Sequence, residues 1–200
     1  MLSARNNPFS TDCVPRARYR FNADDWARLI ATLACHHGRG ALVGQKGSGK
    51  TTLLEDLAVR LRRTGQDVTL IRLSAEFPRL PGAYNRAFFA GLTSRDAVLL
   101  DGAEQLSLLS WFQLRWRTRR AGFLVVTTPR AGRLPLLHRC TTSPELLCEL
   151  VSSLGQLLNA DESVALYQRH RGNVRDALLE LYDQRAKDSA HPLSFPALHA

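Results

Sequence analysis

Residues 44–51, which read Gly-Gln-Lys-Gly-Ser-Gly-Lys-Thr, constrain the fold of this chain more than any other segment. The short apolar run 40–44 leads into them, and residues 49–65 carry the apolar spacing of a helix that ends at Gly65. The glycines allow a compact loop whose N–H groups point inward. A helix that starts near Gly49 adds the positive end of its dipole. The segment therefore predicts a strand, a tight anion-binding loop and a helix in direct succession.

The spacing of this loop fits the phosphate-binding pattern G-x-x-x-x-G-K-[ST], the Walker A or P-loop motif, at every fixed position. In such loops the lysine, here Lys50, reaches the β- and γ-phosphates, and the next hydroxyl, here Thr51, binds Mg²⁺. The alternative is a chance match in a glycine-rich turn, which the strand and helix on its two sides disfavour. We predict ATP and Mg²⁺ as ligands, and the predicted nucleotide-binding residues are Gly44, Gln45, Lys46, Gly47, Ser48, Gly49, Lys50, Thr51 and Thr52.

Beside the Thr51 hydroxyl, the metal ion needs an acidic ligand, and Asp101 is the candidate. It ends the apolar run 96–101, about fifty residues after the loop. Thr51 and Asp101 are therefore the predicted metal ligands. The alternative for Asp101 is a turn-forming Asp-Gly pair.

The residue after Asp101 is Gly102, which cannot act as a base, and the next acid is Glu104. Glu104 is the candidate to orient the attacking water. The alternative is a carboxylate that stabilises the first turn of a helix predicted over 103–118. The sequence leaves both open, and it predicts slow turnover if Glu104 is misplaced.

Strands nearly continuous in apolar residues alternate with helical segments, which indicates a parallel sheet covered on both faces. We therefore predict the α/β three-layer sandwich of P-loop NTPases. From Ser143 onward three helical segments follow without a strand and predict a small helical lid. The predicted strands are 40–44, 67–73, 96–101 and 122–128, with a weaker fifth at 136–140. The predicted organisation is an extended segment 1–23, a nucleotide-binding domain 24–142, a helical lid 143–186 and a flexible tail 187–200.

With these features the chain resembles small AAA+ ATPases of the clamp-loader, origin-recognition and transposition-helper types over residues 24–183. Residues 172–178 are similar to the lid segment G-[ND]-x-R-x-A-L of these proteins. The resemblance implies that Arg175 is the lid arginine that reaches the γ-phosphate; the alternative is a solvated arginine on a helix capped by Asn173. It also implies a polar sensor residue at the end of the fourth strand, Thr127 or Thr128, although threonine favours strands in any case.

The same resemblance implies an arginine supplied to the nucleotide of a neighbouring subunit in a nucleotide-dependent homo-oligomer. Arg130, Arg133 and Arg139 are the candidates. It further implies that residues 7–11 line the adenine pocket. The departure lies at Gly102, where these families usually carry a glutamate. The resemblance therefore supports nucleotide binding by this chain more strongly than it supports hydrolysis.

The composition indicates acidic partners, since 27 basic residues against 18 acidic ones give a net charge of +9. Such a surface attracts nucleotides, nucleic acids or acidic proteins. Residues 115–120 surround Trp116 with arginines, an arrangement that can bind nucleic acid. We instead expect a helix end whose Trp111, Phe112 and Trp116 pack on the sheet, since charge runs are usually solvated.

No apolar stretch approaches the length of a membrane span, and the first residues lack the apolar region of a signal peptide. We therefore expect a cytoplasmic protein without a membrane partner. The four cysteines, at 13, 35, 140 and 148, match no zinc-binding spacing.

The leading functional hypothesis is a slow Mg²⁺-dependent ATPase that acts as a switch on DNA or on another protein. Its rivals are a nucleotide-responsive binding module without hydrolysis and a small P-loop kinase.

Overall fold

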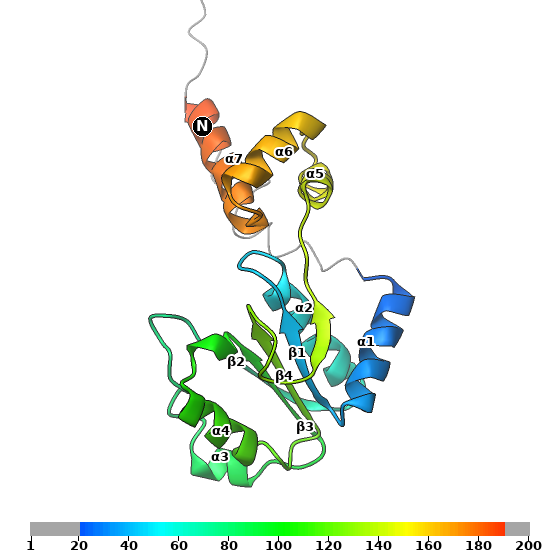
Figure 1. Cartoon of the computed structure of the whole chain (residues 1–200), viewed down its shortest axis with the longest axis vertical. Coiled ribbons are helices and arrows are strands. Elements are labelled where there is room, and N and C mark those ends of the chain that lie inside the picture. The colour runs from blue at the N-terminus through cyan, green and yellow to red at the C-terminus, as the bar shows by residue number, and fades with distance from the viewer. Residues whose placement is uncertain (1–20, 191–200) are drawn as a thin grey trace, which may run out of the picture. The chain divides into compact units, whose positions relative to one another are not determined.

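The computed structural model describes residues 21–190, with side chains up to residue 186. The chain forms two compact units, one ending at Thr141 and the other starting at Thr142, which are described separately (Figure 1). The predictions for residues 1–20 and 191–200, including adenine contacts from residues 7–11, lie outside the described residues.

The helices of the first unit are α1 (Ala23–Cys35), α2 (Lys50–Arg63), α3 (Arg86–Ala90) and α4 (Leu108–Arg117). Its strands are β1 (Arg39–Val43), β2 (Asp67–Arg72), β3 (Asp96–Asp101), β4 (Phe123–Thr128) and β5 (Leu136–Arg139).

The five strands form one sheet in the order β2-β3-β4-β1-β5, and every neighbouring pair is parallel. The predicted α/β fold with a parallel sheet is therefore confirmed. Strand β4 lies between β1, which leads into the glycine loop, and β3, which ends at Asp101. The carboxyl ends of these three strands consequently meet at one edge of the sheet.

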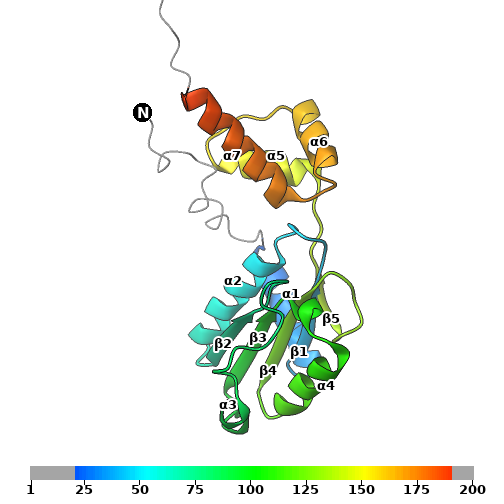
Figure 2. The same ribbon diagram turned by 90° about the vertical axis from the view of Figure 1, so that its left-hand side faces the viewer.

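Alternate residues of each central strand face opposite sides of the sheet and create two cores. Val98 and Leu100 pack with residues of α3 and α4, whereas Ala97 and Leu99 pack with α1 and α2. Figure 2 shows α2 and α4 on opposite sides of the sheet. Burial on both faces explains why these strands are apolar throughout rather than alternating.

The helix predicted over 103–118 is interrupted in the structure. Gly102, with φ 82° and ψ 38°, leads into a single 3₁₀ turn, Ala103–Gln105. The next residue, Leu106, is buried and extended, with ψ 134°, so the helix cannot continue. Helix α4 starts anew at Leu108, where the Ser107 side chain caps it by accepting a hydrogen bond from the Ser110 N–H over 3.2 Å.

The expected packing of the α4 aromatic residues is wrong for two of the three. Trp111 is buried against the sheet, but Phe112 and Trp116 are exposed. Sheet-facing positions of α4 are taken by Trp111 and Leu114, which are three apart and share one face. Phe112 and Trp116 therefore lie on the solvent side of the helix.

The second unit contains three helices, α5 (Pro144–Ser153), α6 (Ala160–Arg169) and α7 (Val174–Ala190). Leu147, Val151, Leu166 and Leu178 belong to its separate apolar core. The start of α5 matches the sequence expectation, because Ser143 caps it and Pro144 occupies its first turn. Helix α7 continues to Ala190, past the predicted end of the lid at residue 186.

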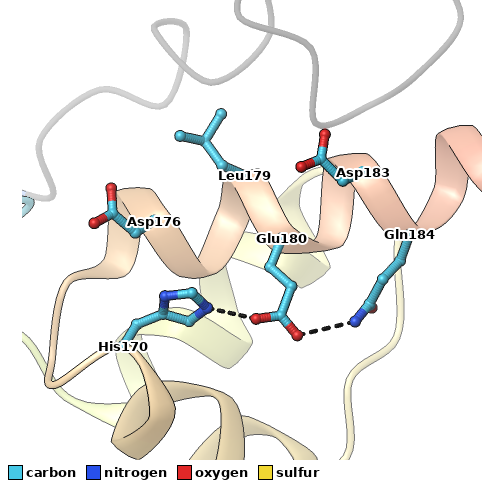
Figure 3. Close-up of a pocket in the computed structure, with 6 residues that line it drawn as sticks. All are labelled: His170, Asp176, Leu179, Glu180, Asp183 and Gln184. Carbon is cyan, nitrogen blue, oxygen red and sulfur yellow. Dashed lines mark hydrogen bonds and ion pairs between the residues drawn. The ribbon is translucent and has the colours of Figure 1, made fainter.

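A polar network connects the end of α6 with α7 (Figure 3). His170 Nε2 lies 2.6 Å from a Glu180 carboxylate oxygen, and Arg169 also forms an ion pair with Glu180. The Gln184 side chain donates to the same carboxylate over 3.0 Å. Glu180 thus accepts from three side chains, and the hydrogen bond from His170 is the main reason that its pKa lies below its ordinary value. Within residues 21–190, no helix is long and apolar enough to cross a membrane.

Candidate functional site

The loop between β1 and α2 adopts a backbone that requires its glycines. Gly47 and Gly49 have φ of 78° and 80°, values that favour glycine. A Cβ atom on Gly44 would lie 2.4 Å from the Cys140 carbonyl oxygen and 2.5 Å from Ser48 Oγ. The loop therefore packs closely against the end of β5, and a larger residue at Gly44 would force it apart.

Lys50 is the first residue of α2, and its side chain folds back over the loop. Its Nζ donates a hydrogen bond to the Gln45 carbonyl oxygen over 2.7 Å. Burial lowers the pKa of Lys50, and the nearby carboxylates of Glu104 and Asp101 oppose this effect, Glu104 more strongly. The ammonium group consequently lies in a partly desolvated place, where its attraction to an anion is strengthened.

Thr51, Asp101 and Thr127 form a continuous hydrogen-bonded chain across the carboxyl edge of the sheet. The Thr51 hydroxyl donates to Asp101 Oδ2 over 2.8 Å. The Thr127 hydroxyl donates to Asp101 Oδ1 over 2.5 Å and accepts from the Gly102 N–H over 2.8 Å. The two predicted metal ligands are thus adjacent, and Thr127 orients the carboxylate from the neighbouring strand.

Gly102 cannot be exchanged for a glutamate without moving the backbone. Its φ of 82° is left-handed, and a Cβ atom there would lie 2.5 Å from the Leu73 carbonyl oxygen. The following 3₁₀ turn carries Glu104, whose side chain is exposed. Of the charged groups that raise the pKa of Lys50, Glu104 has the largest effect. Besides Asp101, Glu104 is therefore the carboxylate whose charge affects the Lys50 ammonium group.

The second threonine of β4 is engaged elsewhere. The Thr128 hydroxyl donates to the Arg130 carbonyl oxygen over 2.8 Å and so stabilises the turn after the strand. Of the two threonines predicted as sensors, only Thr127 contacts a predicted metal ligand.

The three arginines proposed to act on a neighbouring subunit differ in their surroundings. The Arg133 guanidinium donates to the Leu106 carbonyl oxygen over 2.8 Å and lies 5.2 Å from the centre of the Trp111 ring. Arg130 and Arg139 have exposed side chains. The geometry of Arg133 indicates a structural role within its own unit, whereas the other two are available at the surface.

Arg175 belongs to the helical unit, in the first turn of α7, and its side chain is exposed. Asn173, just before this helix, accepts a hydrogen bond from the Asp176 N–H over 3.3 Å. The capping interaction proposed as the alternative is thus present in the structure. It is compatible with a phosphate-binding Arg175, because capping by Asn173 leaves the arginine side chain unconstrained.

The remaining loop residues supply groups that suit a phosphate chain. Gln45 and Lys46 are exposed, and Thr52 is half-buried. The Ser48 hydroxyl is buried, and its oxygen has no hydrogen-bond partner among the described residues. A buried hydroxyl, a lysine ammonium and the start of a helix provide donors for phosphate oxygens, while Thr51 and Asp101 provide the oxygen ligands that Mg²⁺ prefers. The donor set therefore fits a magnesium-bound nucleoside triphosphate.

Two residues of the site were not expected from the sequence. Cys140 contacts the loop from the end of β5, and the Leu73 carbonyl oxygen limits what fits at position 102. The weak prediction of a fifth strand ending near Cys140 was the only sequence signal for the first. The second contact depends on strand order, for which the sequence carries no signal.

A five-stranded parallel sheet, a glycine loop between β1 and α2 and an aspartate at the end of β3 define the class of fold as that of P-loop NTPases. No protein-family model matches the chain, and no curated protein matches it. Among solved structures, the chain is similar to a variant of RuvB from Thermotoga maritima, with a TM-score of 0.51 and 18% sequence identity. The match covers 84% of this chain but 62% of the RuvB chain. At this identity the likeness concerns the fold alone, and it supports an AAA+-like fold.

Proposed function

We propose that this protein binds ATP with Mg²⁺ at residues 44–52 and Asp101 and hydrolyses it slowly. The observation that carries the proposal is the 2.8 Å hydrogen bond from Thr51, the residue after Lys50, to Asp101. It brings a hydroxyl and a carboxylate together at the end of the glycine loop, which is the arrangement that P-loop enzymes use for magnesium.

Each group has a distinct task in this proposal. The loop N–H groups and Lys50 bind the phosphate oxygens, and Thr51 and Asp101 hold Mg²⁺, which supplies positive charge beside the β- and γ-phosphates. Thr127 keeps the Asp101 carboxylate oriented. Arg175, on the helical unit, binds the γ-phosphate and couples its loss to a movement of that unit, which acts as a lid.

Hydrolysis depends on Glu104 in this proposal, because Gly102 has no side chain to act on water. Glu104 accepts the proton of the attacking water or orients it. Its charge already acts on Lys50, which supports a location beside the phosphates. Its exposure in a single 3₁₀ turn supports slow turnover, because an exposed carboxylate is less rigidly positioned than one held by hydrogen bonds.

The nucleotide state then controls a macromolecular partner, either DNA or a protein. The rival function is a binding module that holds ATP and does not hydrolyse it, and the absence of a side chain at Gly102 favours that rival. The third hypothesis, a small P-loop kinase, is disfavoured by the similarity of residues 172–178 to the lid segment of AAA+ ATPases.

The test measures ATP binding by calorimetry with Mg²⁺ and phosphate release for the wild type, Lys50→Ala and Glu104→Gln. Lys50→Ala should lose binding and release, whereas Glu104→Gln should keep binding and lose release. Glu76→Gln, a carboxylate removed from an exposed loop position, is the matched control and should change neither.

Three other results are informative. Binding without phosphate release in every variant would favour the switch without hydrolysis. Release that requires an added small-molecule acceptor would favour the kinase. If wild-type protein gives no heat with ATP and Mg²⁺, the proposal is wrong.

A further inference from the structure

Helix α4 exposes a continuous apolar face to solvent. Leu108 is 72% exposed, Leu109 69%, Phe112 60% and Trp116 68%. Positions 108, 112 and 116 follow at intervals of four, and 109 lies three before 112, so all four side chains share one side of the helix. The opposite side is occupied by Trp111 and Leu114, which are buried in the sheet core. Helix α4 is therefore apolar on two sides, and only one of them is explained by the fold.

This exposed face, called here the α4 face, is flanked by positive charge. Arg115, Arg117, Arg119 and Arg120 are all exposed, and no acidic residue occurs from Leu106 to Ala121. None of these arginines forms an ion pair within the described part of the chain. An apolar stripe with unneutralised arginines at its end differs from a scatter of single exposed apolar residues, and such patches mark interaction sites.

We propose that the α4 face is the docking site for an acidic amphipathic helix of a partner protein. Apolar residues of that helix at i, i+3, i+4 and i+7 would cover Leu109, Phe112 and Trp116, and its carboxylates would pair with the arginines. Charge complementarity selects the acidic partner, since these arginines form no ion pair within residues 21–186. The site is separate from the nucleotide site, so the inference does not depend on ATP binding.

Single-stranded nucleic acid fits the α4 face less well. Binding of bases requires open aromatic rings, and the Arg119 guanidinium already lies 3.9 Å over the centre of the Trp116 ring. Leu108 and Leu109, the two most exposed members, offer nothing to a phosphate or to the polar edge of a base. Two leucines and a phenylalanine instead provide the apolar area that holds a helix in a groove or on a face.

The experiment titrates the full chain, without nucleotide, into a fluorescein-labelled helical peptide that carries leucines on one face and glutamates on the other. Fluorescence anisotropy should show binding, and a scrambled peptide of the same composition should bind much more weakly. Phe112→Ser should weaken binding about tenfold, because it removes a large apolar contact. Phe77→Ser is the matched control, since Phe77 is 71% exposed on the same unit but outside the α4 face, and it should have no effect.

A second pair of variants tests the charge. Arg120→Ala should weaken peptide binding about threefold and reduce its salt dependence, while Arg63→Ala, at an exposed arginine near the end of α2, should do neither. The inference is overturned if the peptide and its scrambled form bind equally, or if neither binds. It is also overturned if Phe112→Ser instead weakens binding of oligothymidylate, or if it abolishes self-association of the chain measured by sedimentation.

Discussion

The Thr127 hydroxyl donates a 2.5 Å hydrogen bond to Asp101 Oδ1, across the boundary between two adjacent strands. The same oxygen atom of Thr127 accepts the Gly102 N–H over 2.8 Å. One buried side chain therefore determines both the direction of the carboxylate that Thr51 contacts and the course of the turn that leads to Glu104. These two hydrogen bonds make Thr127 a positioning residue. This role can be tested without knowing which macromolecule the protein binds.

Thr127→Val should destabilise the sheet-containing unit by about 2 kcal/mol, because it leaves the partly buried Gly102 N–H without its acceptor while nearly preserving volume. It should also weaken Mg²⁺-dependent ATP binding. Urea unfolding followed by tryptophan fluorescence measures the first effect for this unit alone, because all three tryptophans, Trp26, Trp111 and Trp116, belong to it.

Thr128→Val serves as the comparison, since its hydroxyl donates to the Arg130 carbonyl oxygen instead. We expect it to lower stability but to leave the magnesium dependence of ATP binding unchanged. An equal loss of magnesium dependence in both variants would contradict the positioning role of Thr127.

Gly102→Ala should destabilise the same unit by roughly 3 kcal/mol, from left-handed backbone strain together with the contact at Leu73. Gly65→Ala separates the two causes. Gly65 has nearly the same φ, 83°, but nothing lies within 4 Å of its missing Cβ atom, so only about 1 kcal/mol of strain is expected. Urea unfolding of both variants gives the difference directly.

Gly102→Glu extends this prediction to activity. The new carboxylate should not increase phosphate release, because the backbone at this position cannot accept a side chain without moving away from Leu73. A variant that is both stable and faster than wild type would show that the turn at Gly102 is more adaptable than its contacts indicate.

The sequence predicted the strands, the glycine loop and the acid at the end of β3, because each depends on local patterns: an apolar run, fixed glycine spacing and a polar strand end. The failures all depend on tertiary contacts. Within residues 103–118, Ser107 is of a residue type that caps helices, but no local pattern shows that Leu106 is drawn into the core and divides the helix. Trp111 and Phe112 are adjacent, and only the position of the helix on the sheet decides which of them is buried. Likewise, the order β3-β4-β1, which makes Thr127 a neighbour of Asp101, cannot be read from spacing along the chain.

Arg133→Ala should lower the stability of the sheet-containing unit by about 1–2 kcal/mol, since it removes the hydrogen bond to Leu106 and the contact with Trp111. Arg130→Ala and Arg139→Ala remove exposed side chains and should change stability by less than about 0.5 kcal/mol. Tryptophan fluorescence in urea again provides the measurement. If Arg133→Ala is as stable as Arg130→Ala and Arg139→Ala, the structural role of Arg133 is contradicted, and all three arginines remain candidates to act on a neighbouring subunit.

Glu180 makes the stability of the helical unit depend on pH. Its pKa lies below the ordinary value, mainly because of the hydrogen bond with His170 and further because of Arg169. A carboxyl group whose pKa is depressed by folding contributes stability that is present above its ordinary pKa of about 4.3 and is lost as the pH falls through its folded value. Glu180→Gln should therefore speed hydrogen exchange of α7 amides at pH 7, consistent with a loss of about 0.5 kcal/mol for a partly exposed pair. The difference from wild type should shrink as the pH falls below the ordinary pKa and through the lower pKa of folded Glu180. Asp183 lies less than one turn further along α7 and forms no hydrogen bond or ion pair within residues 21–186, so Asp183→Asn should match wild type throughout this pH range. A difference between Glu180→Gln and wild type that persists at low pH would mean that packing, rather than charge, explains the effect of this residue.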